Sequence, residues 1–176
     1  GMVELMPVFA EAVYDRGVTG LGMLASASGV GAVASTFMLS RVRSDPAAFQ
    51  RVTVIGAFAA GCGMLGLGFA PWYELAVVLV AITGFGLTAV GVGSQTALQL
   101  TVDNKLRGRV MSFWSATSFG GIALGGTMLG AISEAGHIQY TARGSGILIL
   151  CAAVFGFWRL YRIATNSSKP ATETAK

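Results

Sequence analysis

The sequence predicts an all-α integral membrane protein. Hydrophobic residues make up 53% of the 176-residue chain and charged residues 11%, whereas a typical soluble domain has about 25% charged residues. Five apolar stretches are nearly free of charge, and a helix of about 20 apolar residues is long enough to cross a hydrocarbon core about 30 Å thick. A single soluble domain of this size could not bury all five stretches, so we expect each of them to span a membrane.

The basic residues orient the predicted spans. Ten of the twelve Lys and Arg residues fall into three clusters, and only Arg16 and Arg143 lie elsewhere. Loops rich in Lys and Arg stay on the cytoplasmic side of a membrane. If every stretch crosses, the three clusters share the cytoplasmic side and the two single arginines lie on the other. We therefore predict a multi-pass protein of the inner (plasma) membrane with a cytoplasmic C-terminus. The clusters are Arg41, Arg43 and Arg51; Lys105, Arg107 and Arg109; and Arg159, Arg162, Lys169 and Lys176.

The first spans follow from the apolar stretches and the turns between them. Residues 2–13 are too short to span and are predicted to be the second half of a helix. The first two complete spans are expected at 19–40 and 52–70, separated by a basic loop in which Pro46 should discourage helix. The third span, 75–100, follows a tight turn at 71–74 whose aromatic residues suit a membrane interface.

Two further spans complete the predicted bundle. The fourth is expected at 106–133, and a loop holding Tyr140 and Arg143 follows it on the non-cytoplasmic side. The fifth is expected at 144–163. Residues 164–176 are rich in Ser, Thr and Lys and are predicted to be disordered. The chain is thus divided into a transmembrane bundle, residues 1–163, and a cytoplasmic tail, residues 164–176.

Small residues form stripes at helical spacing on the first and fourth spans, in a chain that contains 25 glycines. In lipid, small residues let helix backbones approach closely. We expect these stripes either to pack helices tightly or to form a surface on which helix bundles slide. The second and fifth spans carry almost no polar side chains and are predicted to face lipid. The stripes contain Gly22 and Gly29 in the first span, and Gly121, Gly125, Gly126 and Gly130 in the fourth.

The third span carries the most polar helix face. Gly84, Thr88, Gly91, Gln95 and Gln99 recur along it at helical spacing. Polar side chains are unfavourable in hydrocarbon, so this face is expected to contact protein or water. Two interpretations follow. The stripe forms hydrogen bonds between helices near the cytoplasmic end, or Thr88, Gln95 and Gln99 line a substrate pathway.

No pattern in the sequence predicts an enzyme. Residues 61–66 match the Gly-x-Gly-x-x-Gly dinucleotide pattern, but they lie within an apolar span and not between a strand and a helix. An intramembrane serine hydrolase would need Ser28 to meet His137, which is expected in a loop. Cys62 and Cys151 are expected to be buried free thiols. We therefore expect no catalysis, cofactor or metal, and we interpret the basic residues as contacts to lipid headgroups and not to nucleic acid.

The loop before the fourth span contains the most specific local pattern, at 103–112. Asp103 suits the start of the following helix, because a carboxylate there accepts hydrogen bonds from free backbone N–H groups. Arg107 and Arg109 either act as topology signals alone or also form cytoplasmic contacts that lock one state of a transporter.

These motifs resemble one transporter family, the major facilitator superfamily. The resemblance is to the C-terminal half of these transporters, in the branch related to enterobactin exporters and called transmembrane secretion effectors. It extends to about residue 162 and is most specific around 107–111. The matching runs are Pro7-Val8-Phe9-Ala10, Gly20-Leu21-Gly22-Met23-Leu24-Ala25-Ser26-Ala27-Ser28-Gly29-Val30-Gly31-Ala32, Gln99-Leu100-Thr101-Val102-Asp103, and Leu106-Arg107-Gly108-Arg109-Val110-Met111-Ser112.

The resemblance implies a six-helix half, made of the end of helix 7 plus helices 8 to 12, of a twelve-helix fold. It implies that helices 7 and 10 line the central cavity, that 8 and 11 contact the other half, and that 9 and 12 face lipid. The expected partners are therefore the lipid bilayer, a small-molecule substrate and the missing N-terminal six-helix half. Glu4 is the only carboxylate that could lie within the membrane, either as a protonation site or as an interfacial acid.

The leading hypothesis is a fragment of a proton-coupled exporter of small molecules, such as siderophores, macrolides or drugs, that works by alternating access. The alternative is a non-transporting assembly or regulatory module made of a lone half-transporter. Export and proton coupling follow from the resemblance alone.

Overall fold

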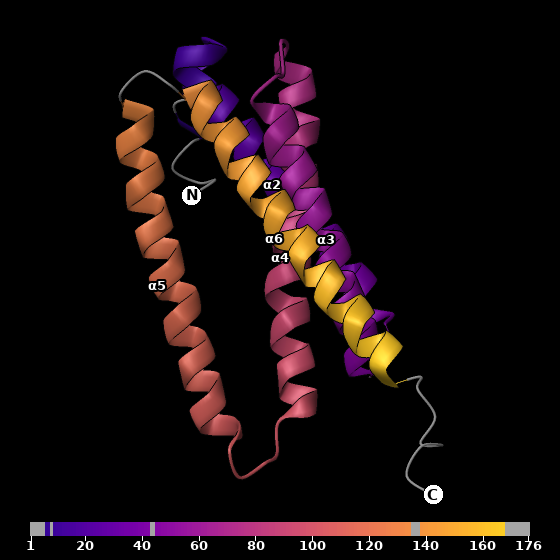
Figure 1. Cartoon of the computed structure of the whole chain (residues 1–176). Helices are drawn as coiled ribbons and strands as arrows, with labels where there is room; N and C mark the ends of the chain where they lie inside the picture. The colour runs from indigo at the N-terminus through magenta and orange to yellow at the C-terminus, as the bar shows by residue number, and fades with distance from the viewer. Residues whose placement is uncertain (1–5, 8, 43–44, 135–137, 168–176) are drawn as a thin grey trace, which may run out of the picture.

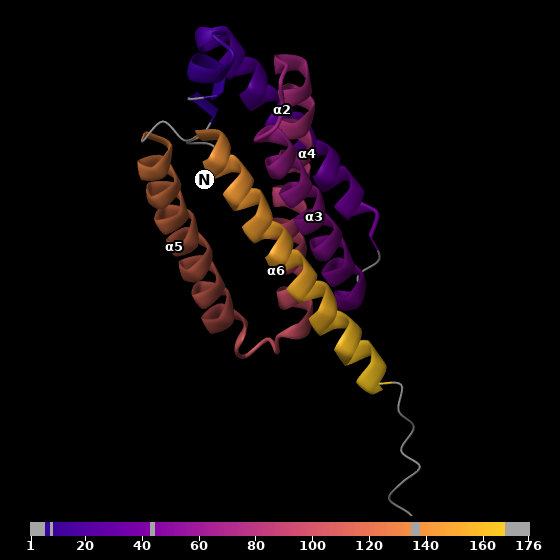
Figure 2. The ribbon, with the colours of Figure 1, turned by 45° about the horizontal axis from the view of Figure 1, so that its top comes forward.

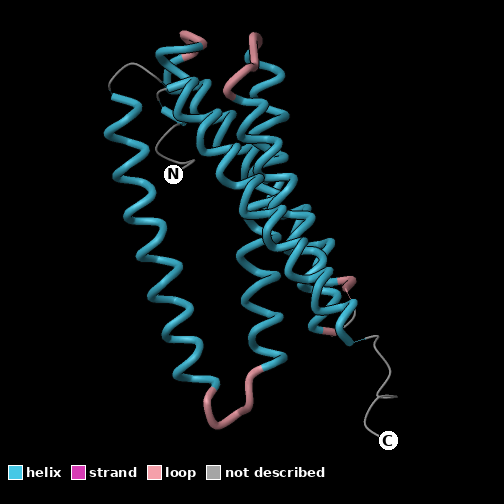
Figure 3. The backbone as a smooth tube through the Cα atoms, in the orientation of Figure 1, coloured by secondary structure: helices cyan, strands magenta, loops and turns pink. Residues whose placement is uncertain are grey.

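Helices and short turns make up the part of the chain that the computed structural model describes, residues 6–7, 9–42, 45–134 and 138–167, and no strand occurs there (Figure 3). The predicted all-α membrane fold is confirmed. Each predicted span corresponds to one helix, and consecutive helices run in opposite directions (Figure 1). The elements are η1 (Phe9–Val13), a π-helical turn, then α2 (Gly17–Ser40), α3 (Pro46–Leu67), α4 (Tyr73–Thr101), α5 (Arg107–Glu134) and α6 (Ile138–Ser167).

Four segments of the described chain are long and apolar enough to cross a membrane: α2, α3, α4 and residues Tyr140–Arg159 of α6. The helix α5 has 28 residues, a sufficient length, but it is not among these four. Glycine, serine and threonine recur throughout α5 and lower its mean hydropathy. The predicted fourth span is therefore a helix of the right length that is less apolar than the others.

The bounds of two helices, α3 and α6, differ from the prediction. Pro46 begins α3 and does not interrupt it, and the side chain of Asp45 accepts a hydrogen bond from the Ala47 N–H at 3.1 Å. A proline is tolerated in the first turn of a helix, because the N–H that it lacks has no helical partner there. The helix α6 begins at Ile138, so Tyr140 and Arg143 lie on the helix and not in a loop. It also continues to Ser167, into the predicted tail, whereas residues 168–176 lie outside the described part.

The core is built around α4, which packs against α2 on one side and α3 on the other. Glycines bring these helices together. A Cβ added at Gly86 of α4 would collide with the backbone of Gly56 and Ala60 in α3, and one added at Gly31 of α2 would lie 2.8 Å from the Phe85 nitrogen of α4. The close approach of backbones is the packing expected of small residues in a membrane.

The helix α3 also packs against α6, which crosses it (Figure 2). A Cβ added at Gly61 would lie 2.7 Å from the Leu150 side chain, and one added at Gly146 would lie 2.6 Å from the Leu65 backbone nitrogen. The helix α3 therefore has two helix neighbours, but it keeps an exposed side that includes Ile55, at 59%, and Cys62. The prediction that the second span faces lipid stays a prediction for that side. In the glycine run at 61–66, Gly61 faces α6, whereas Gly63 and Gly66 face α4.

The two ends of the bundle differ. We call the end that carries the α4–α5 loop and the end of α6 the basic end, which lies at the bottom of Figure 1. The opposite end holds the turn between η1 and α2, the α3–α4 turn and the start of α6. The larger buried cluster lies there and includes Phe9, Leu24, Met64 and Tyr73. A smaller cluster around Phe49 lies toward the basic end.

The helix α5 stands to one side of the other helices in both views (Figures 1 and 2). Its contacts with α4 and α6 are sparse. Its large apolar side chains are correspondingly exposed, with Phe113 at 78% and Met128 at 68%. A helix with so much exposed apolar surface needs a further partner, either lipid or protein.

Candidate substrate pathway and helix surfaces

The polar stripe of α4 is covered by α2 in its first half and open in its second. A Cβ added at Gly84 would lie 2.8 Å from the Ser28 hydroxyl of α2, whereas nothing lies within 4 Å of a Cβ added at Gly91. Thr88 and Gln95 are half-buried, and Gln99 is exposed. The stripe is therefore most accessible near the basic end.

The stripe opens because α2 crosses α4. Gly31 contacts the Phe85 backbone near the middle of the bundle. Closer to the basic end, Leu39 of α2 belongs to the buried cluster that contains Ala97 of α4. By helical spacing, Ala97 lies on a different face of α4 from Gln95. As α2 passes to that face, the second half of the stripe is left uncovered.

The side chains of Thr88, Gln95 and Gln99 form no hydrogen bond within the described part of the chain. The hydroxyl of Thr88 and the amides of Gln95 and Gln99 are therefore available to a substrate, to water or to another part of the protein. Both interpretations of the stripe, interhelical hydrogen bonding and a pathway lining, stay predictions. Glu4, the candidate protonation site, lies outside the described residues.

Most glycines of the predicted small-residue stripes have no neighbouring helix within this chain. Nothing lies within 4 Å of a Cβ added at Gly22, Gly29, Gly121 or Gly125. Gly126 is buried, and the surroundings of Gly130 lie outside the described part. The glycines that bring helices together within the chain are others, such as Gly31, Gly86 and Gly146. The role of the predicted stripes in packing or sliding therefore stays a prediction that involves a partner.

The loop between α4 and α5 departs from the predicted cap. The carboxylate of Asp103 accepts a hydrogen bond from the N–H of Asn104 at 3.1 Å, not from an N–H of α5. The backbone carbonyl of Asp103 instead accepts from the N–H groups of Leu106 and Arg107, both at 3.0 Å. The side-chain cap was wrong, because α5 begins four residues after Asp103. Arg107 and Arg109 are exposed.

At the opposite end, Arg143 fastens α6 to the turn between α3 and α4. Its Nε donates a hydrogen bond to the Gly68 carbonyl at 2.8 Å, and its guanidinium lies 3.9 Å from the centre of the Phe69 ring. The carbonyl is one that a helix end leaves without a partner, and an arginine satisfies it well. Sequence reasoning treated Arg143 only as a topology signal, and nothing in the local pattern identifies Gly68 as its acceptor.

A second group of contacts ties the start of α2 to the start of α4. The guanidinium of Arg16 lies 5.1 Å from the centre of the Tyr73 ring and 3.9 Å from a carboxylate oxygen of Glu74. The hydroxyl of Tyr73 donates to the Gly20 carbonyl at 2.8 Å, and that of Tyr14 donates to the Ala70 carbonyl at 3.0 Å. Burial raises the pKa of Tyr14 above its ordinary value. We call the contacts of Arg16, Tyr14, Tyr73 and Arg143 the latch.

The turn that carries the latch needs an unusual backbone. Asp15 and Gly17 have φ values of 50° and 53°, in the left-handed region that glycine and aspartate adopt more readily than other residues. This turn reverses the chain from η1 into α2 and places Tyr14 and Arg16 beside the α3–α4 turn.

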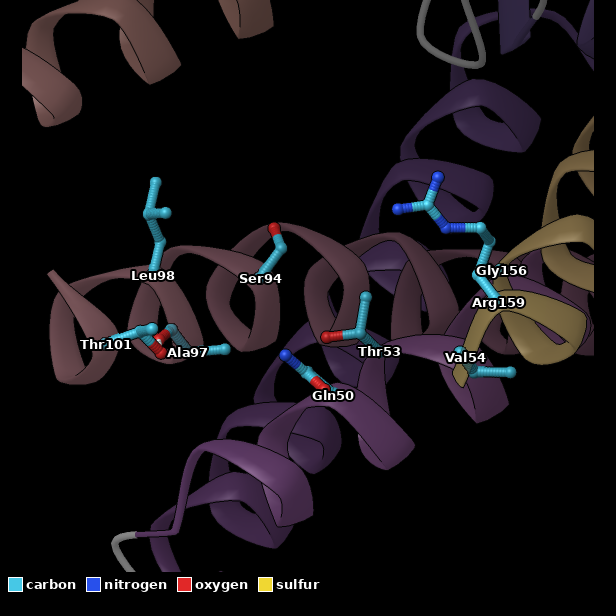
Figure 4. A pocket seen from close by; sticks show the side chains of 9 residues that line it. All are labelled: Gln50, Thr53, Val54, Ser94, Ala97, Leu98, Thr101, Gly156 and Arg159. Carbon is cyan, nitrogen blue, oxygen red and sulfur yellow. Dashed lines mark hydrogen bonds between the residues drawn. The ribbon is translucent and has the colours of Figure 1, made fainter. Parts of the chain in front are cut away.

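A groove of about 440 Å³ lies at the basic end between α3, α4 and α6 (Figure 4). Sequence reasoning did not find it, because it depends on the crossing of three helices and not on any one pattern. Its walls combine polar and apolar side chains from all three helices. The lining residues are Gln50, Thr53, Val54, Ser94, Ala97, Leu98, Thr101, Gly156 and Arg159.

The two cysteines are free and exposed. The expectation of free thiols is confirmed, whereas the expectation that both are buried was wrong. Cys62 lies on the uncovered side of α3, and Cys151 lines a shallow apolar groove on α6 with Leu150 and Trp158. Neither thiol lies on the polar face of α4.

Comparison with known proteins identifies the family of the chain. A sequence model of the family described as transmembrane secretion effector matches residues 1–174. Curated relatives include the enterobactin exporter EntS of Escherichia coli O127:H6 (strain E2348/69 / EPEC) and that of Escherichia coli O6:K15:H31 (strain 536 / UPEC). Each is 27% identical over 146 residues, which cover 83% of this chain and 34% of the relative. The chain thus spans about a third of the length of these relatives. No solved structure matches it significantly.

Proposed function

The chain belongs to the transmembrane secretion effector family of the major facilitator superfamily, and on this basis we propose that it forms the C-terminal half of a small-molecule exporter. The resemblance inferred from its motifs is confirmed by that family match. In the proposed mechanism, the bundle formed by η1 and α2–α6 rocks against a second bundle around a central binding site. Alternating access of this kind uses conformational change, not covalent chemistry.

The uncovered second half of the α4 stripe carries the proposal. Gly91, Gln95 and Gln99 lie beyond the part of α4 that α2 covers, and no described residue forms a hydrogen bond with either glutamine. Polar side chains within a membrane span are favourable only where they contact protein, water or a polar ligand. A substrate pathway along this face provides water and polar ligands to both amides.

The open faces of α2 and α5 support the presence of a second bundle. Gly22 and Gly29 leave one surface of α2 without a neighbour, and Gly121 and Gly125 do the same on α5. Small residues permit close contact with other helices and also permit sliding. We propose that the N-terminal six-helix half of the transporter occupies these surfaces.

The substrate class and the energy source are parts of the same proposal. The similarity to proteins named as enterobactin exporters supports a siderophore or another amphipathic molecule, such as a macrolide or a drug. We propose proton coupling, with Glu4 as the group that binds and releases a proton. The basic clusters support an orientation in the inner membrane with the C-terminus in the cytoplasm.

Efflux from a host that lacks its own exporters tests the proposal. The full-length transporter is expressed, and the export of siderophores, macrolides and fluorescent drugs is measured with and without a proton gradient. We expect export by the wild type and a decrease of about ten-fold in Gln95→Ala, equivalent to the loss of about 1.4 kcal/mol of stabilisation. The variant Glu4→Gln should export without responding to the gradient, or not at all.

The control variant is Cys62→Ala, an exposed change on α3 away from the stripe, which should export like the wild type. Membrane levels of all variants are measured in parallel. If no compound is exported by a wild-type protein that reaches the membrane, the exporter proposal fails and the non-transporting module is favoured.

A further inference from the structure

The groove between α3, α4 and α6 has a side with hydrogen-bond donors that the proposed transport mechanism does not use. It is formed by the first turns of α3, the last turns of α4 and the last part of α6, which all lie at the basic end (Figure 4). Gln50 comes from α3 and Arg159 from α6. The groove is separate from the stripe, because Gln95 and Gln99 are not among its lining residues.

Arg159 and Gln50 are available as donors to an anion. Neither forms a hydrogen bond or an ion pair within the part of the chain that the structure describes. The two described acids of the basic end are engaged elsewhere, since Asp45 accepts from the Ala47 N–H and Asp103 from the Asn104 N–H. The guanidinium of Arg159 therefore has no described carboxylate to neutralise it, and a planar guanidinium binds phosphate oxygens well.

Three hydroxyl groups line the same groove as acceptors. Thr53 donates to the Phe49 carbonyl at 2.9 Å, Thr101 to the Ala97 carbonyl at 2.8 Å and Ser94 to the Gly91 carbonyl at 3.2 Å. Each hydroxyl has one hydrogen, so its remaining capacity is to accept. The groove thus presents donors suited to a phosphate and acceptors suited to hydroxyl groups beside that phosphate.

The rest of the wall is apolar. Val54, Ala97 and Leu98 line it, and Gly156 leaves room because a Cβ added there would meet only the Val54 side chain, at 3.9 Å. A free phosphate ion would leave this apolar wall in contact with water, which is unfavourable. A phospholipid covers it with its glycerol backbone and the first methylenes of its chains.

We propose that this groove is a binding site for an anionic phospholipid with a hydroxyl-bearing headgroup, of the phosphatidylglycerol type. Arg159 and Gln50 bind the phosphate, and the oxygens of Thr53, Ser94 and Thr101 accept from the headgroup hydroxyls. Anionic lipids are attracted to basic residues at the membrane surface in general. In addition to this general attraction, the groove provides a matching shape and hydrogen bonds for one lipid molecule.

Native mass spectrometry of the full-length protein, purified in neutral detergent, tests this site. The protein is titrated with phosphatidylglycerol, phosphatidylcholine or inorganic phosphate. We expect one phosphatidylglycerol molecule to be retained preferentially. Arg159→Gln should weaken its binding about ten-fold, as expected for the loss of a charge-assisted hydrogen bond. Arg159→Lys should be intermediate, because it keeps the charge and loses the planar fork.

The matched control is Arg51→Gln, which removes the same charge from an exposed position at the same end of the bundle and should bind phosphatidylglycerol like the wild type. Unchanged thermal unfolding of each variant establishes that it is folded. Equal losses of phosphatidylglycerol binding in Arg159→Gln and Arg51→Gln would mean that general surface charge explains the binding, and would overturn the site. Equal retention of phosphatidylcholine, or full displacement of the lipid by millimolar phosphate, would also overturn it.

Discussion

At the scale of single residues, the side chains with the strongest long-range contacts lie at the end of the bundle opposite the basic clusters. Arg143, Tyr73 and Tyr14 each donate a hydrogen bond to a backbone carbonyl more than fifty residues away in the chain. The Gly68 carbonyl follows the last turn of α3 and the Ala70 carbonyl lies in the α3–α4 turn, so neither has a helical partner. The latch therefore stabilises the turns that connect the helices, and it leaves the basic end less constrained.

Replacing Arg143 by alanine should destabilise the protein by about 1–3 kcal/mol. The change removes a charged donor from the Gly68 carbonyl and a cation–π contact with Phe69. Thermal unfolding in detergent measures the loss. Arg107→Ala, which removes an exposed arginine at the basic end, is the control and should change stability little. Equal stability of the two variants would contradict a role for the Gly68 contact.

The contribution of Tyr14 should depend on pH in a defined direction. Burial raises the pKa of Tyr14 above 10.0 in the folded protein, so folding favours the protonated phenol. The stabilisation is present below the unfolded pKa of about 10 and is lost as the pH rises through the higher folded value. The difference in unfolding free energy between wild type and Tyr14→Phe should be constant from about pH 7 to 9 and should decrease above about pH 10. A difference that persists unchanged at higher pH would contradict this account.

At the scale of helices, two kinds of glycine are distinguished by what surrounds them. Gly86 lies against the backbone of α3, so a side chain there must displace Gly56 or Ala60. Gly121 lies on α5 with nothing within 4 Å of an added Cβ. Both are helical glycines within long spans, and sequence alone does not separate them.

The variants Gly86→Leu and Gly121→Leu should therefore differ in stability. The first should lower the unfolding free energy by about 1–3 kcal/mol or more, because the added side chain overpacks the contact between α3 and α4. The second should leave the stability of this bundle close to that of the wild type. Unfolding of both variants is measured in the same detergent. Equal destabilisation would mean that Gly121 packs against another helix of this bundle, which would contradict an open surface on α5.

The sequence predicted the number and order of the helices because hydropathy averaged over about 20 residues is a strong signal. It failed where one helix meets another. The start of α6 at Ile138 was missed because its first turns are polar, and Pro46 was interpreted as a helix breaker although it begins α3. The contacts of α3 with both α4 and α6 were missed because an apolar span suits lipid and protein neighbours equally well.

At the scale of the whole molecule, the bundle has one closed end and several open surfaces. The latch closes the end opposite the basic clusters, while α2 leaves the second half of the α4 stripe uncovered and α5 stands apart. The polar stripe was predictable from its spacing on one helix. The groove and the latch were not, because both depend on which helices cross and where.

If a second bundle docks on α5, Gly121→Leu should impair transport without impairing stability. The leucine side chain would obstruct close helix contact at a position that this chain leaves open. Efflux by the full-length protein is the measurement. The control is Gly144→Leu, a glycine of α6 with nothing within 4 Å of an added Cβ. Normal efflux in Gly121→Leu would indicate that this part of α5 faces lipid.

The central claim, that the uncovered half of the α4 stripe lines a substrate pathway, is tested most directly by the accessibility of single cysteines in native membranes. Cys62 and Cys151 are first replaced by alanine, and Thr88, Gly91, Gln95 or Gln99 is then changed to cysteine in the full-length protein. Ile82→Cys, 39% exposed on the same helix but outside the stripe, is the reference. We predict that Gln95→Cys and Gln99→Cys react with a small polar thiol reagent much faster than Ile82→Cys, and that an exported substrate slows the reaction. Equal reactivity of Gln95→Cys and Ile82→Cys, with no protection by any substrate, would contradict a pathway along this face.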